Sequence, residues 1–118
     1  MTMNIDMPVV DELDNAVDSI PKLVFAAALK YGNLTAIEEG DVKISYQDLP
    51  NESLAVSRAL IATGIKPGDR VAIWGSNSVH WILAAIGLQM AGAILVPINT
   101  RMKAIEAAEI INALSDAY

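Results

Sequence analysis

The chain has 118 residues, of which 53% are hydrophobic and 19% are charged, and its formal net charge is −6. At this length we expect one small domain, which buries roughly two-thirds of the surface that its unfolded chain would expose. The eight basic residues are scattered along the chain, so no basic patch is available to hold a nucleic acid by counterion release. The chain has no cysteine and a single histidine, His80, which excludes disulfides, thiolate metal sites and multi-histidine metal sites.

Residues 1–18 contain five acidic side chains and no basic one. A signal peptide needs a positively charged start and an apolar middle. We therefore interpret these residues as a flexible acidic lead-in and expect a cytoplasmic protein. Residues 19–118 are expected to form a partial α/β subdomain.

A helix is predicted directly after the lead-in. Ser19 can cap its N-terminus, with Pro21 in the first turn, where the missing N–H is harmless. Gly32 is placed to end it. The residues that follow at helical spacing are Leu23, Ala26, Ala27 and Lys30.

A β-hairpin is predicted next, because residues 36–39 and 42–44 are separated by Gly40-Asp41, a two-residue loop that favours hairpins. The carboxylates at its tip are better explained by a solvated turn than by a general acid and base, whose pKa values only burial would separate. The expected register sets Ile37 opposite Ile44 and Glu38 opposite Lys43, and the tip carboxylates are Glu38, Glu39 and Asp41.

A second helix is predicted over residues 46–63, with Ser45 as its cap and Gly64 at its end. Pro50 lies past the first turn from Ser45. Either that turn is distorted or the regular helix begins at Pro50 itself. One stripe of this helix consists of Leu49, Ser53, Val56, Leu60 and Thr63.

Residues 66–98 predict a βαβ unit. Lys-Pro-Gly-Asp at residues 66–69 is a turn by composition. Residues 70–74 have the pattern of a short buried strand, and residues 93–98 form the second strand. Parallel strands joined through a helix take a right-handed crossover.

The helix between these strands is predicted over residues 79–91, with Ser76, Asn77 or Ser78 as its cap. It is apolar nearly all round, so most of its surface must be buried. Because later strands and helices would normally cover it, we expect it to expose apolar surface in this chain. Aggregation or a loosely packed state is the predicted consequence.

A last helix is predicted over residues 105–114, with Ala107, Ile111 and Leu114 on one face. A βαβα series continues with a strand, but the chain ends four residues after Leu114. We therefore expect an incomplete sheet.

A membrane helix is an alternative interpretation of residues 81–98, in which Gln89 is the only hydrophilic side chain. Against it, Gly87, Gly92 and Pro97 interrupt the run, and its second half favours a strand. The βαβ interpretation is therefore preferred.

The loop at residues 75–78 lies where α/β proteins often bind phosphate, at the start of the helix that follows a parallel strand. It has one glycine and matches neither phosphate-loop pattern, so a helix cap with a tight turn explains it better. His80 has no acidic neighbour in sequence, and Ser78 is only two positions away, which argues against a nucleophile–base pair. Packing or hydrogen bonding at a domain surface is its favoured role.

Asn99 and Arg101 follow the end of the second parallel strand, where α/β ligand sites tend to lie. Arg101 could face an anion, pair with Glu106 or cover apolar surface with its stem.

The order and spacing of several short motifs, over about residues 19–117, resemble the N-terminal part of AMP-forming acyl-CoA synthetases. The motifs are, in chain order, Ile44-Ser45-Tyr46 with Asp48-Leu49, Ala59-Leu60, Gly64-Ile65-Lys66-Pro67-Gly68-Asp69-Arg70-Val71-Ala72-Ile73, Asn77-Ser78 with Trp81, and Ala91-Gly92-Ala93 with Val96-Pro97-Ile98-Asn99. His80-Trp81 together with Asn99-Thr100-Arg101 looks most like a bacterial branch that activates acids from fatty-acid or steroid-ring breakdown. In two places the sequence departs from the family pattern: Ser76 stands where proline is common, and Lys103-Ala104 replaces a Thr-Pro helix start, which implies a weaker cap.

The resemblance implies an enzyme that joins ATP and a carboxylic acid into an acyl-adenylate with Mg²⁺ and passes the acyl group to coenzyme A. In the family, ATP binds a Ser/Thr/Gly-rich loop ending in Pro-Lys-Gly, and a catalytic lysine lies in a small C-terminal domain. Neither motif occurs in this sequence, so we assign no catalytic, cofactor-binding or metal-binding residue. We expect a truncated N-terminal scaffold that is inactive alone and needs the remainder of the same polypeptide. The alternatives are a stand-alone nucleotide-binding module that uses residues 75–78 and a small membrane-anchored protein.

Overall fold

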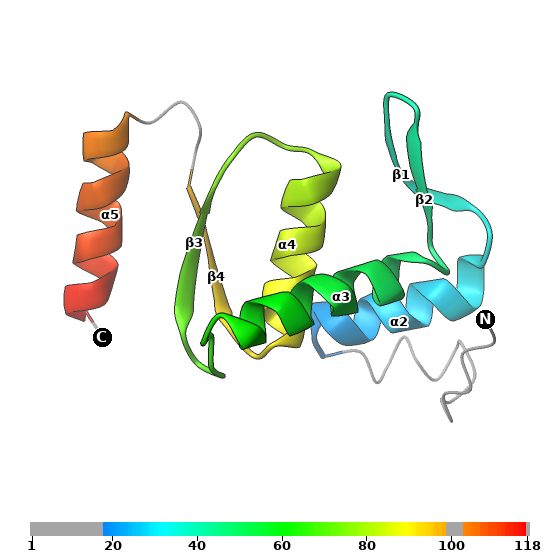
Figure 1. Ribbon diagram of the computed structural model, residues 1–118, viewed down its shortest axis with the longest axis horizontal. Helices are drawn as coiled ribbons and strands as arrows, with labels where there is room; N and C mark the ends of the chain where they lie inside the picture. Colours follow the sequence, from blue (N-terminus) through cyan, green and yellow to red (C-terminus); the bar gives the residue numbers. More distant parts are fainter. Residues whose placement is uncertain (1–17, 99–102, 118) are drawn as a thin grey trace. The chain divides into compact units, whose positions relative to one another are not determined.

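The computed structural model describes residues 18–98 and 103–117 as a mixed α/β chain with two separate two-stranded sheets (Figure 1). The chain divides into two compact units, Met1–Glu52 and Ser53–Tyr118. The predicted lead-in, apart from Asp18, lies outside the described residues. In chain order the elements are α2 (Ile20–Tyr31), β1 (Thr35–Glu39), β2 (Val42–Ser45), α3 (Leu49–Ala62), β3 (Arg70–Trp74), α4 (Val79–Met90), β4 (Ile94–Ile98) and α5 (Ala104–Ala117).

Helix α2 begins and ends where its sequence signals predict. The Ser19 side chain accepts a hydrogen bond from the Lys22 backbone N–H at 3.3 Å, and proline occupies the first turn. Gly32 follows the helix with φ at 53°, a left-handed conformation that glycine adopts without a Cβ penalty. The predicted spacing, however, does not mark the buried face, because Leu23 is 50% exposed. The buried residues of α2 are Val24, Ala26 and Ala28.

Strands β1 and β2 form the predicted antiparallel hairpin. The register pairs Ile37 with Ile44 and Glu38 with Lys43, as expected from the Gly-Asp loop. Lys43 Nζ lies 3.8 Å from Glu38 Oε1, and Ile44 is buried. The hairpin thus has the predicted apolar and charged cross-strand pairs.

Helix α3 resolves the ambiguity at Pro50. The Ser45 side chain accepts a hydrogen bond from the Asp48 N–H at 3.0 Å, which closes a turn before the helix. The prediction that Ser45 caps a helix starting at residue 46 is therefore wrong. The helix itself begins at Leu49, so Pro50 lies in its first turn, where a missing N–H removes no intrahelical bond. The start of the predicted stripe is buried, with Leu49 and Ser53 among its members, but Thr63 at its end is exposed.

Strands β3 and β4 pair in parallel from Arg70 opposite Ile94 to Trp74 opposite Ile98. Helix α4 connects them and contacts both strands (Figure 1), which confirms the predicted βαβ unit. The expectation that β3 is buried is wrong, because its exposure alternates along the strand and Trp74 is 51% exposed. Successive side chains point to opposite faces of a strand. On the face that carries Trp74 and Ile94, the paired residue Ile98 is buried, so this face is exposed over only part of its length.

The predicted turn before β3 is fixed by its own hydrogen bonds and by the end of α4. The Asp69 carboxylate accepts from the Lys66 N–H at 2.8 Å, and the Gly68 N–H donates to the Gly92 carbonyl at 2.9 Å. Gly92 has φ at 80°, and a Cβ on it would lie 3.2 Å from the Pro67 Cβ. Glycine is therefore required there by conformation and by the approach of the turn.

Helices α3 and α4 approach each other closely at Gly87, within the second unit. A Cβ on Gly87 would lie 2.9 Å from Val56 Cγ1, 3.1 Å from the Ser53 carbonyl oxygen and 3.1 Å from the Ser57 nitrogen. Ser53 and Ser57 are 0% and 3% exposed. Small residues on both helices therefore let the two backbones come together.

Helix α4 does not present the exposed apolar surface that was expected. All of its residues except His80 are buried or half-buried. The exposed large hydrophobic side chains of the βαβ unit lie instead on the strands, at Trp74 and Ile94. The predicted tendency to aggregate stays a prediction.

The C-terminal helix α5 begins one residue earlier than predicted and runs three residues further. The Glu106 carboxylate reaches back to the Lys103 N–H at 3.4 Å. This bond is one half of a capping box, and Lys103 has no side-chain acceptor to supply the other half. Of the predicted face, Ala107 is buried and Ile111 is exposed.

The described helices are all too short or too polar to cross a lipid bilayer. Residues 81–98 divide into most of α4, a turn through Gly92, and β4. The membrane-helix interpretation of this run is therefore wrong.

Candidate functional site

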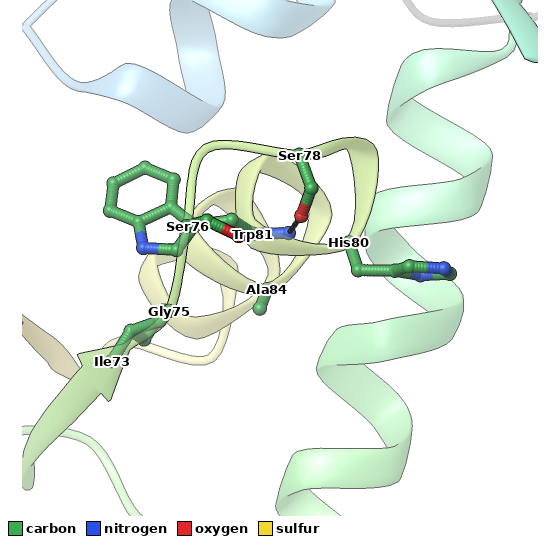
Figure 2. Close-up of a pocket in the computed structure, with 7 residues that line it drawn as sticks. All are labelled: Ile73, Gly75, Ser76, Ser78, His80, Trp81 and Ala84. Carbon is green, nitrogen blue, oxygen red and sulfur yellow. Dashed lines mark hydrogen bonds between the residues drawn. The ribbon is translucent and has the colours of Figure 1, made fainter. Parts of the chain in front are cut away.

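The loop between β3 and α4 and the first turns of α4 surround a hollow of about 330 Å³. Ser78 is the N-cap of α4, in extended conformation, and its Oγ accepts a hydrogen bond from the Trp81 N–H at 3.1 Å (Figure 2). Of the three cap candidates, Ser78 is thus the one used. The hollow is lined by Ile73, Gly75, Ser76, Ser78, His80, Trp81 and Ala84.

The walls of this hollow are mostly apolar. Ile73 comes from β3, whereas Trp81 and Ala84 come from α4. Ser78, Trp81 and Ala84 are spaced three residues apart, which places them along one side of a helix start. This three-residue spacing could have indicated the hollow from the sequence. It could not be recognised there, because nearly all residues from 81 to 98 are apolar.

The loop at residues 75–78 does not have the glycine conformation of a phosphate-binding loop. Gly75 does not have a positive φ. A Cβ on it would lie 3.7 Å from Trp81 Cδ1, which is an ordinary van der Waals distance. Its backbone therefore needs no glycine, unlike the loops that wrap phosphate. Because the Ser78 hydroxyl already caps α4, the loop has the predicted character of a cap with a tight turn.

Among the described residues, His80 is not paired with a nucleophile. Its side chain is exposed, and in Figure 2 its ring points away from Ser78 and Trp81. Within residues 18–98 and 103–117, no hydrogen bond or ion pair orients the imidazole, so it lacks the partner that a catalytic base requires. Its geometry is that of a surface residue at the rim of the hollow.

The remaining candidates do not form a second site. Glu38, Glu39 and Asp41 are exposed at the hairpin tip, as the solvated-turn interpretation predicts. Among the described residues, no three or more His, Asp or Glu side chains are arranged so that they could hold a metal ion. Asn99 and Arg101 lie outside the described residues, so their ligand-facing role stays a prediction.

Comparison with known proteins identifies the family. Residues 24–117 match the model of the AMP-binding enzyme family. The chain is 43% identical over 91 residues to a (7a-methyl-1,5-dioxo-octahydro-1H-inden-4-yl)propanoyl:CoA ligase from Rhodococcus jostii, covering 77% of this chain and 18% of that protein. A ligase of the same name from Mycobacterium tuberculosis is 35% identical over 98 residues, covering 83% of this chain and 19% of that protein.

Solved structures agree with this assignment. The N-terminal domain of FACL13 from Mycobacterium tuberculosis superposes with a TM-score of 0.75 at 33% identity, over 80% of this chain and 24% of that one. The N-terminal subdomain of Klebsiella oxytoca NpsA gives a TM-score of 0.78 at 23% identity, over 82% of this chain and 26% of that one, which supports the fold alone.

The fold is therefore that of the N-terminal subdomains of adenylate-forming enzymes. The chain belongs to the AMP-binding enzyme family, and it spans less than one fifth of the length of these two curated relatives.

Proposed function

We propose that this chain forms the N-terminal scaffold of an ATP-dependent, AMP-forming acyl-CoA ligase. The complete enzyme would use ATP and Mg²⁺ to convert a carboxylic acid into an acyl-adenylate and would then transfer the acyl group to coenzyme A. The identity of 43% with a CoA ligase over most of the chain carries this proposal. The described residues contribute the βαβ unit and its packing, and no catalytic side chain is assigned to them.

The proposed substrate is a carboxylic acid from steroid-ring or fatty-acid breakdown. The two relatives named as ligases of a bicyclic propanoate are 43% and 35% identical over more than three quarters of the chain. A fatty acid–acyl-carrier-protein ligase from Streptomyces coeruleorubidus is 40% identical over only 58% of it. The broader match supports a ring-bearing acid as the first substrate to test.

A chimeric enzyme tests the scaffold role. Residues 24–117 would replace the matching segment of the Rhodococcus jostii ligase, and acyl-CoA formation from the bicyclic propanoate would be measured. We expect the chimera to retain ligase activity. A matched chimera with Gly87→Val should lose it, because the larger side chain has no room at the contact of α3 with α4. A folded, soluble chimera without activity would contradict the proposal.

The isolated chain provides the complementary test. In a pyrophosphate-release assay with ATP, Mg²⁺ and either a fatty acid or the bicyclic propanoate, we expect no turnover. Catalysis by the 118 residues alone would overturn the scaffold role. Saturable ATP binding that weakens in Ser78→Pro or Asn77→Asp would support the stand-alone nucleotide-binding module instead.

We further propose that the enzyme works in the cytoplasm, where ATP and coenzyme A are both available. Cell fractionation with an antibody against this chain tests the location. Recovery in an extracytoplasmic fraction would contradict it.

A further inference from the structure

We draw no further inference here: the strongest candidate, the exposed apolar side chains of Trp74 and Ile94 on one face of the β3–β4 pair, is a surface patch for which nothing in the described residues shows what covers it.

Discussion

The close contact at Gly87 predicts that even a single added methyl group destabilises the second unit. Three atoms of α3 lie within 3.1 Å of the position that a Cβ would take, and two of them belong to the backbone. The Val56 methyl can move by a rotamer change, but the Ser53 carbonyl and the Ser57 nitrogen can move only if the helices separate. Gly87→Ala therefore forces α3 and α4 apart.

Two opposing effects set the magnitude. At an open helix position, replacing glycine by alanine stabilises by about 1 kcal/mol, because alanine loses less backbone entropy. Overpacking a close contact costs about 1–3 kcal/mol, and the two backbone atoms place this site in the upper half of that range. We expect a net loss of at least about 1 kcal/mol for Gly87→Ala and a larger loss for Gly87→Val, whose branched side chain adds two more methyl groups.

Amide hydrogen exchange, read by mass spectrometry on peptides from α3 and α4, measures this loss locally. A loss of about 1 kcal/mol corresponds to exchange about fivefold faster in both helices, because a tenfold change in an equilibrium equals about 1.4 kcal/mol. The hairpin of β1 and β2, which belongs to the other unit, should exchange as in the wild type and serves as an internal reference.

A matched variant separates packing from helix propensity. Ala59 is exposed on α3, so Ala59→Gly should lose about 1 kcal/mol through propensity alone. If propensity also governed position 87, Gly87→Ala would slow exchange instead of accelerating it. Unchanged or slower exchange in Gly87→Ala would refute the close-contact argument. Adding Val56→Ala to Gly87→Ala should restore only part of the loss, since the two backbone contacts persist.

The remaining predictions concern a cap, a buried hydroxyl and an ion pair. Ser78→Ala should weaken the start of α4 by about 1 kcal/mol, because the bond from the Trp81 N–H is lost. The exposed Ser76→Ala is its control, and equal exchange rates in the two variants would contradict the cap. Ser53 Oγ is buried and has no hydrogen-bond partner among the described residues. In urea denaturation, Ser53→Ala should therefore leave the free energy of unfolding unchanged or raise it by up to about 1 kcal/mol. A clear decrease would show that the hydroxyl has a partner. A hydrogen bond from Lys22, and secondarily its charge, lowers the pKa of Asp18 below its ordinary value of 3.8. The small stabilisation of the first turn of α2 is therefore present above that value and disappears as the pH falls through the lower folded pKa. In an NMR titration, Lys22→Met should return this pKa to the ordinary range, and an unchanged pKa would contradict the pairing.

The hairpin and the Ser19 cap of α2 were predictable because each depends on residues close in sequence. Gly40 has φ at 57°, a conformation that glycine adopts readily, and the two-residue loop then leaves one register for Ile37 and Ile44. Ser19 and Ser78 bond to amides three residues further on. Such contacts form at short range, so no distant part of the chain has to be known.

The candidate site was only half predictable. The sequence locates the loop at residues 75–78 and shows that it lacks a phosphate pattern, yet three serine or asparagine residues compete there for the cap. The backbone conformation decides among them, because Ser78 is extended and its Oγ accepts the hydrogen bond from the Trp81 N–H. The apolar wall around Trp81 emerges only when β3 and α4 are placed side by side.

By itself the sequence determined the order of the elements, the hairpin register, the parallel βαβ unit and the family resemblance. Tertiary structure alone decided which residues are covered. Leu23 and Trp74 are strongly hydrophobic but about half exposed, whereas Ser53 is polar and fully buried. The physical reason is that the burial of a residue depends on what packs against its face of the element. The hydrophobicity of the residue sets only how much free energy is gained when that face is covered.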